Sequence, residues 1–377
     1  MTLVLDTAHM SLYTAAGNDP LALWAAASTP LGMEQRLTHP AALASPGGCH
    51  QVLRGVPSMN TSQDSVTRMR ALLRGALRHP LPAQALVLWP YHPTSGERTR
   101  PHPEAFWSWM AEAGLRHPEA RWQPVCVDGS AITLLDQARD ALSCHPERTL
   151  FLGGVDSLLH PESLLSLVDC QVPLAWDNED GLVPGEAAIF LPMRDKGRGI
   201  HVLGWDSCPE PTTGCGAPDE HPALPQALDS ALGQAGLKPS DLDGIVLPPG
   251  SGPHGDRAWW SCQAHLWPLR ADIREGSPLP PAPDNDPLPP ESVTPPILNS
   301  GVTTGHAGAV QWLLQLALAG IWMRHTRFMA RSGAGPRIAT TAVLDCPLGD
   351  ERGAVILGDE TGQDACGQGM PVPPSPQ

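Results

Sequence analysis

The segment 125–142, VCVDGSAITLLDQARDAL, places a cysteine and an aspartate directly ahead of a stretch with helical periodicity. A thiol becomes a nucleophile when its pKa is lowered, and a helix N-terminus is the usual device. Cys126 is therefore a candidate nucleophile, with an inert small residue as the alternative. Asp128 is a second candidate, but its attack on a thioester would give a mixed anhydride, a poor resting intermediate. The pattern favours Asp128 as an N-cap that accepts hydrogen bonds from the amides of Ser130 or Ala131.

Histidines supply the other candidates for acid–base chemistry. His306 follows a glycine and opens a long apolar segment, where its ring can donate to a substrate or bind the carbonyls of its own loop. His254 lies in GSGPHG, which is too short and too poorly placed for a phosphate-binding loop. A further group of residues fits no standard zinc spacing, namely Cys208, Cys215, His201 and His221. The sequence therefore predicts no metal and no cofactor.

The composition limits the class of protein. The chain has 377 residues, of which 41% are hydrophobic, so it can build two ordinary domains or one large duplicated domain. A net charge of −15 without a visible basic face argues against nucleic-acid binding. Nine cysteines without a paired framework, and a start without a basic and apolar leader, predict a cytoplasmic protein with reduced thiols. The apolar segment 307–323 holds two glutamines, which favours a buried helix over a membrane span.

Strand and helix patterns alternate in two cycles. The first cycle predicts helices at 60–79 and 129–144, a buried strand at 85–90, and a strand over 148–159 that two glycines stop. Segments 185–193 and 200–206 flank a tight turn, which predicts an antiparallel hairpin.

The second cycle predicts helices at 223–236, 255–269 and 305–325, followed by two closing strands within 338–360. A proline-rich, acidic insert at 274–296 is expected to be extended and exposed, and the tail 361–377 to be disordered. This alternation indicates an α/β protein whose sheets are covered on both faces.

Four segments resemble, in order, the β-ketoacyl synthase branch of the thiolase-like superfamily. The first is 125–142 with the following GGVDSLL, similar to a nucleophile helix and its next strand. The second, GLVPGEAAIFL at 181–191, resembles the family's Pro-Gly-Glu-[Gly/Ala]-Ala strand. The third, LPPGSGPHGD at 247–256, is similar to an altered His-Gly-Thr-Gly-Thr…Gly-Asp loop. The fourth, NSGVTTGHAGAV at 299–310, resembles the Ser-x-Lys…Gly-His…Gly-Ala loop and helix.

The resemblance covers residues 1–360 and implies a duplicated, thiolase-like, five-layered α-β-α-β-α fold that dimerises. It implies an N-terminal half at 1–205 and a C-terminal half at 206–360. The family condenses acyl thioesters on acyl carrier protein or coenzyme A. A cysteine takes the acyl group, two histidines assist decarboxylation of a malonyl unit, and a lysine orders the site.

Carried over residue by residue, the resemblance implies that most of this catalytic set is lost. The nucleophile falls on Asp128, and the first histidine falls on Pro249, or on Pro248 without a gap. The lysine falls on Gly301, and the second histidine matches His306. The gating Gly-Phe-Gly-Gly loop is replaced by CPLGDERG at 346–353. Two acids in the matching segments are expected to be structural: Glu186 as a buried tether between strands, and Asp156 as a turn cap.

Two functions from different classes remain open. The first is a non-catalytic, ketosynthase-like accessory protein, a scaffold that forms a homodimer or a heterodimer with a ketosynthase. Chain-length factors, which pair with an active ketosynthase, are one template. Ketosynthase-like proteins of type VI secretion loci are the other, with an effector or adaptor as partner. The alternative is a divergent β-ketoacyl-ACP synthase or acyltransferase that uses Cys126 and His306, with His254 as a further candidate and acyl carrier protein as partner.

Overall fold

The computed structural model describes residues 3–28, 64–92, 101–127, 129–160, 163–164, 167, 182–210, 221–248, 253–267, 294–299, 304–347 and 351–359. Most of the predicted insert 274–296 and the whole tail 361–377 lie outside these residues. The division into halves at residue 205 stays a prediction.

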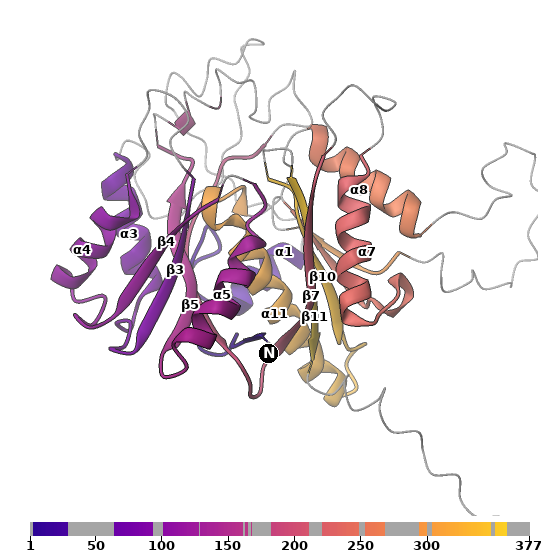
Figure 1. The fold of residues 1–377 in the computed structure, drawn as a ribbon, viewed down its shortest axis with the longest axis horizontal. Helices are drawn as coiled ribbons and strands as arrows, with labels where there is room; N and C mark the ends of the chain where they lie inside the picture. Colours follow the sequence, from indigo (N-terminus) through magenta and orange to yellow (C-terminus); the bar gives the residue numbers. More distant parts are fainter. Residues whose placement is uncertain are drawn as a thin grey trace, which may run out of the picture.

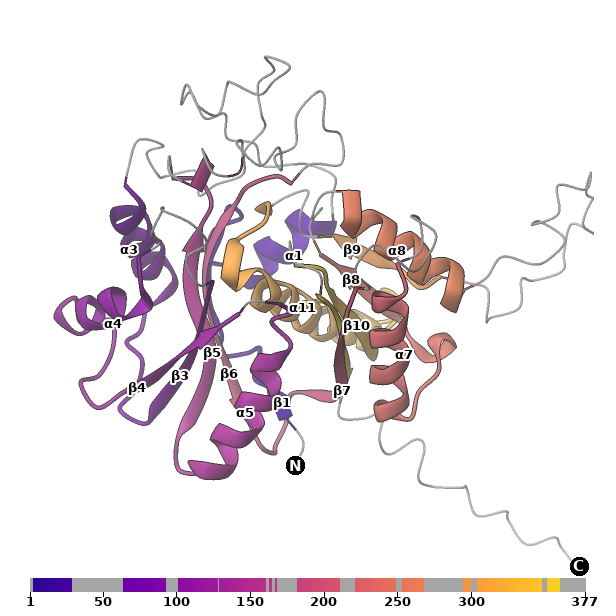
Figure 2. The ribbon, with the colours of Figure 1, turned by 45° about the horizontal axis from the view of Figure 1, so that its top comes forward.

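The described elements stack in five layers (Figure 1). The first outer layer holds α3 (Ser65–Ala76) and α4 (Pro103–Glu112), and the second holds α7 (Ala223–Ala235) and α8 (Pro253–Leu266). Between the two groups of strands lie α1 (Pro20–Ser28), α5 (Thr133–Cys144) and α11 (Gln311–Arg331). Figure 2 shows α1 beside α11 in this central layer. Both faces of the strands are thus covered by helices, which confirms the predicted α-β-α-β-α arrangement.

The strands repeat one pairing pattern twice. In the first half, β4 (Arg121–Cys126), β3 (Ala85–Tyr91) and β5 (Thr149–Ser157) pair in parallel, and β6 (Glu186–Arg194) joins β5 antiparallel. In the second half, β9 (Ile297–Asn299), β8 (Gly244–Leu247) and β10 (Thr340–Asp345) pair in parallel, and β11 (Glu351–Asp359) joins β10 antiparallel. The matching order confirms the predicted duplication.

A short N-terminal strand connects the two groups. The order is β4-β3-β5-β6-β1-β7-β11-β10-β8-β9, with β1 at Leu3–Leu5 and β7 at Ile200–Pro209, and β2 (Ser11–Tyr13) pairs with β6 off this path. The hairpin predicted from β6 and β7 is therefore wrong, since β1 lies between them and pairs antiparallel with each. The connection 195–199 crosses this inserted strand, and Gly199 passes so close to Leu5 that a Cβ would lie 2.6 Å from the Leu5 carbonyl oxygen.

Strand β5 also differs from its prediction. It runs through Gly153 and Gly154 instead of stopping there, because both glycines pair with β6. A Cβ on Gly153 would lie 2.6 Å from the Phe190 ring, and one on Gly154 would lie 2.7 Å from the Trp89 indole nitrogen. The two glycines therefore admit neighbouring aromatic side chains to the strand.

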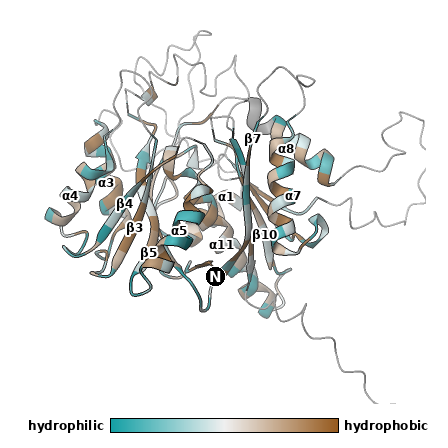
Figure 3. Ribbon diagram, viewed as in Figure 1, coloured by the Kyte–Doolittle hydropathy of each residue, from teal (hydrophilic) through white to brown (hydrophobic). Residues whose placement is uncertain are grey.

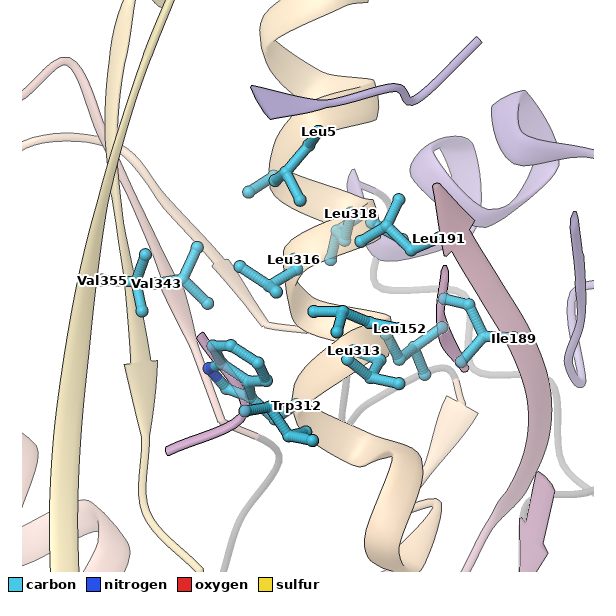
Figure 4. Close-up of a cluster of buried hydrophobic side chains, with 14 of the residues drawn as sticks. Leu5, Leu152, Ile189, Leu191, Trp312, Leu313, Leu316, Leu318, Val343 and Val355 are labelled. Carbon is cyan, nitrogen blue, oxygen red and sulfur yellow. The ribbon is translucent and has the colours of Figure 1, made fainter. Parts of the chain in front are cut away.

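The core is centred on α11, whose residues 311–323 are all buried. Leu313 and Leu318 lie toward Leu152, Ile189 and Leu191 on one side, and Trp312 lies toward Val343 and Val355 on the other (Figure 4). Strands β3 and β5 are likewise predominantly hydrophobic (Figure 3). Each such side chain stabilises the fold by about 1.5–3 kcal/mol on burial. Segment 307–323 is thus a core element, and no described helix is long and apolar enough to cross a membrane.

Candidate functional site

His306 lies in a fully buried loop that precedes α11. This histidine loop, residues 304–310, ends in the 3-10 turn η3 (Gly308–Val310). Its backbone forms a β-bridge with the segment before β6: the His306 amide donates to the Val183 carbonyl at 2.7 Å, and the Gly185 amide donates to the His306 carbonyl at 2.9 Å. Two of the four matched sequence segments are thus held together by paired backbone.

Glycines make this close approach geometrically feasible. Gly305 has φ +65° and Gly308 has φ +59°, a region that other residues rarely adopt. A Cβ on Gly305 would lie 2.8 Å from the Val183 carbonyl oxygen, and a Cβ on Gly185 would collide with the Thr304 carbonyl oxygen. The Pro-Gly-Glu and Gly-His-Ala-Gly patterns therefore reflect backbone contact between the two segments.

Two buried carboxylates fix the surroundings of this loop. Asp156 accepts hydrogen bonds from the amides of Ser157 and Ala309, both at 2.8 Å, and so joins the end of β5 to the histidine loop. Glu186 binds the guanidinium of Arg68 on α3 through two contacts, one of them 2.9 Å, and accepts a 2.8 Å bond from the Ser157 hydroxyl. The Arg68 and Glu186 side chains are fully buried. The structural role predicted for Glu186 agrees with these contacts, and Asp156 links two elements beyond the predicted turn.

The His306 ring has a defined tautomer in its neutral form. The Gly308 amide donates to His306 Nδ1 at 3.1 Å, so this nitrogen is an acceptor and the ring proton lies on Nε2. His306 is 7% exposed. At least one ring nitrogen therefore supports the fold of its own loop.

Carboxylates also occupy the start of the central helix α5. We call residues 129–132 the entry turn. The Ser130 amide donates to Glu351 at 2.7 Å, while the Ser130 hydroxyl and the Ala131 amide donate to Asp345 at 2.7 and 2.9 Å. The Ser207 hydroxyl on β7 donates to the other oxygen of Glu351 at 2.6 Å. The second half of the molecule thus supplies two carboxylates to a turn of the first half.

The environment of Asp345 changes its protonation. The side chain is buried, and the removal of solvent raises its pKa to about 6, with a further rise from the nearby Glu351 charge. Hydrogen bonds from Ser130 and Ala131 and the positive charge of Arg352 act in the opposite direction. Asp345 therefore holds its proton to a higher pH than an exposed aspartate does.

Comparison with known proteins places the fold. No family model and no curated protein matches the sequence. The ishigamide ketosynthase/chain length factor matches with a TM-score of 0.60 at 14% identity, over 95% of this chain and 99% of that chain. A β-ketoacyl synthase from Burkholderia phymatum STM815 gives 0.59 at 14% identity, over 95% and 99%. A ketosynthase in complex with its chain length factor from Xenorhabdus doucetiae gives 0.55 at 16% identity, over 95% and 98%.

This chain has the thiolase-like ketosynthase fold. Within it, Cys126 and His306 lie on different elements and differ in exposure. Cys126 is the last residue of the edge strand β4 and is exposed, seven positions ahead of the first residue of α5, while His306 is buried. The helix dipole acts over the first turn, so it gives little help to a thiol at that distance along the chain.

Other predicted positions of the ketosynthase set lie outside the described residues. These are Asp128, Pro249 and Gly301, and the side chain of His254 in α8 is likewise not described. The amides assigned to an Asp128 cap, those of Ser130 and Ala131, donate to Glu351 and Asp345. Asp128 itself lies outside the described residues, so its role as a cap stays a prediction.

The structure describes only part of the group formed by Cys208, Cys215, His201 and His221. Among the residues in the described ranges, no cluster of three His, Cys, Asp or Glu side chains could hold a metal ion. His221 binds Glu210 at 2.6 Å, and burial raises the pKa of the Cys208 thiol. Cys215 lies outside these ranges.

Sequence reasoning missed Asp345, Glu351, Ser207 and Arg68. A signal for the first two was present, since Asp345 immediately precedes the altered gate segment 346–353 and Glu351 lies inside it. One acid directly before the replaced glycine-rich gate and one inside it mark a change in chemistry at this point. No pattern in the sequence marks the residues that bind these two acids, namely Ser130, Ala131 and Ser207.

Proposed function

We propose that this protein is a non-catalytic member of the ketosynthase fold, whose structure serves as a binding and dimerisation scaffold. The observation that carries the proposal is the pair of carboxylates on the entry turn. A nucleophile there would have to form a thiolate and then stabilise an oxyanion, and a nearby negative charge opposes both.

The state of the predicted catalytic set supports the same conclusion. By the sequence match, a nucleophile and a lysine are replaced, and a proline without a donor stands for the first histidine. Loss of the nucleophile from a cooperative catalytic set costs about a millionfold in rate. His306 remains, and its Nδ1 is engaged by Gly308.

A ketosynthase is the favoured binding partner of this protein. Two of the similar structures are described as a ketosynthase with a chain length factor. Strand β4 ends the strand order and has exposed side chains at Arg121, Gln123 and Pro124, so an edge is available for a neighbouring chain. A role beside a type VI secretion effector or adaptor rests on the sequence resemblance alone.

Acyl loading tests the catalytic question directly. The protein is incubated with acyl-carrier-protein or coenzyme A thioesters of several chain lengths and examined by intact-mass spectrometry, with Cys126→Ala in parallel. We expect no mass gain in either protein. A gain that Cys126→Ala abolishes would instead establish an acyltransferase that uses Cys126.

The partner question needs its own experiment. The protein is co-expressed with the ketosynthase, or the effector and adaptor, encoded beside its gene, and the complexes are separated by size-exclusion chromatography with light scattering. We expect a stable dimer, and the heterodimer with a ketosynthase as the favoured form. A monomer under all these conditions contradicts the scaffold.

A further inference from the structure

Trp260 is an exposed indole on the outer helix α8. The helix buries Trp259, Cys262 and Leu266 in the hydrophobic core of the second half, as an amphipathic helix of an outer layer does. Trp260 does not belong to this core and is 61% exposed, whereas the neighbouring Trp259 is 8% exposed. Single exposed apolar side chains are common on proteins, so Trp260 indicates a binding site only together with a second observation.

The second observation is the place where the chain returns to α8. The chain leaves the described residues after Trp267, one position beyond the end of α8, and enters them again at Thr294. The side-chain amide of Gln263 donates to the Thr294 hydroxyl at 3.1 Å. Gln263 is three positions from Trp260, and residues three apart are neighbours on a helix surface. The intervening segment 268–293 therefore starts and ends at the helix that carries Trp260.

The sequence of segment 268–293 is suited to an indole surface. The tetrapeptide PLPP occurs twice in it, at 278–281 and at 287–290. Proline-rich stretches favour the polyproline II conformation, and recognition sites for this conformation are lined by aromatic side chains. Acidic residues outnumber basic ones in the segment, and Arg257, which precedes Trp260 by one turn, is exposed. Shape and charge on α8 thus both match the segment.

The length of the connection favours the second PLPP as the stretch that meets the indole. Its last residue, Pro290, precedes Thr294 by four positions, which span about 12 Å in a polyproline II helix. Gln263, which binds Thr294, lies about 4.5 Å from Trp260 along the axis of α8. The second PLPP can therefore reach the indole on a short tether, which gives it a high effective concentration there.

We propose that Trp260 is a docking site for a polyproline stretch and that its occupant is the segment 287–290 of the same chain. In this arrangement the indole packs against the proline rings, and Arg257 attracts the two acids that flank the stretch, Asp286 and Glu291. The inference goes beyond the proposed function, because it assigns an interaction surface on α8 that does not depend on whether the protein is catalytic.

Fluorine NMR of the full chain tests the contact. The protein is labelled with fluorotryptophan, and Trp260→Phe identifies the resonance of Trp260 by its loss. The triple variant Pro287→Ala, Pro289→Ala, Pro290→Ala should shift this resonance, because the indole loses its proline contacts and becomes more exposed to water. The resonance should also become more sensitive to the exchange of H2O for D2O.

The first PLPP supplies the matched control. The triple variant Pro278→Ala, Pro280→Ala, Pro281→Ala removes the same number of prolines from the same segment and should leave the Trp260 resonance in place. A resonance that does not move in the 287–290 variant overturns the proposal. Shifts of equal size in both variants overturn it as well, because they would report a general property of the segment.

Proteolysis gives a second readout on the full chain. Endoproteinase Glu-C cleaves after Glu291, which directly follows the proposed contact. Trp260→Ala should raise the rate of this cleavage about tenfold, because the rate follows the population of the undocked segment. Phe328→Ala deletes another exposed aromatic side chain, 70% exposed on α11, and should leave the rate unchanged. Equal rates in Trp260→Ala and the parent protein contradict the docking site.

Dilution distinguishes the same chain from a second copy. Docking within one chain does not depend on protein concentration, whereas docking between chains weakens on dilution by mass action. The Trp260 resonance of the parent protein should therefore stay in place on dilution. A resonance that moves on dilution toward its position in the 287–290 variant would show that the stretch comes from a second copy, and would overturn the assignment to the same chain.

Discussion

The histidine loop and the entry turn are both held by carboxylates, but the two regions use them differently. At the histidine loop, Glu186 is paired with a guanidinium, and Asp156 accepts two amides. At the entry turn, Asp345 and Glu351 lie close enough for like charges to shift a pKa. In the first region the Glu186 charge is compensated by Arg68, whereas the second region brings two carboxylates together.

The contacts that hold the fold together are therefore found in one region, and the departure from a ketosynthase site is found in the other. The compensated region coincides with the two most specific sequence matches, 181–191 and 299–310. The region that carries the extra acids coincides with the replaced gate at 346–353. Backbone contacts and a buried ion pair preserve the architecture, while the chemistry at the helix start is altered.

The largest effect is expected from breaking the compensated pair. Glu186→Ala leaves the Arg68 guanidinium buried without its carboxylate, which costs about 3–5 kcal/mol. Urea unfolding followed by circular dichroism measures the loss. The double variant Arg68→Met, Glu186→Leu removes both charges and should be more stable than Glu186→Ala alone. If the single variant lost less than about 1 kcal/mol, the pair would not be the element that compensates this region.

Much of the fold was predictable, because local patterns specify it. The strand 85–90 appears as β3, and the helix predicted at 223–236 appears as α7 and ends at Gly236 with φ +68°. The pairing of β6 was not predictable, since a turn between two strands does not reveal that Leu3–Leu5 is inserted between them.

The sequence predicted only those parts of the candidate site that lie within a single segment. Sequence matching located His306 and the tether Glu186. It assigned the entry-turn amides to a neighbour, Asp128, because local capping is the commoner arrangement. Their partners in the structure are more than 200 positions away in sequence, at Asp345 and Glu351. Such contacts depend on the duplicated fold bringing β10 and β11 to the start of α5.

A smaller effect, dependent on pH, should mark the entry turn. The pKa of Asp345 is about 6 in the folded protein, against an ordinary value of 3.8. The folded state therefore binds the proton more tightly, and this group's contribution to stability is present below about pH 4 and is lost as pH rises to about 6. The change is at most about 3 kcal/mol.

Asp345→Asn removes this titration. The stability of the variant relative to the parent should rise between pH 4 and 6 and stay constant above that range, as measured by urea unfolding at each pH. Asp136→Asn, at an exposed position on α5, should give a difference that does not follow this curve. Parallel curves for Asp345→Asn and the parent protein would mean that Asp345 does not titrate in this window.

The smallest effect should come from His306, and its pattern distinguishes two roles of the ring. If the ring serves the loop, the important atom is Nδ1, which accepts from Gly308. An asparagine side chain places its oxygen where Nδ1 lies, whereas a glutamine side chain reaches toward Nε2. His306→Asn should therefore lose less than about 1 kcal/mol, and His306→Gln about 1–2 kcal/mol, because the Gly308 amide is left unsatisfied in a buried loop. The reverse order, with glutamine tolerated and asparagine not, would show that the Nε2 side of the ring carries the function and would favour the catalytic alternative.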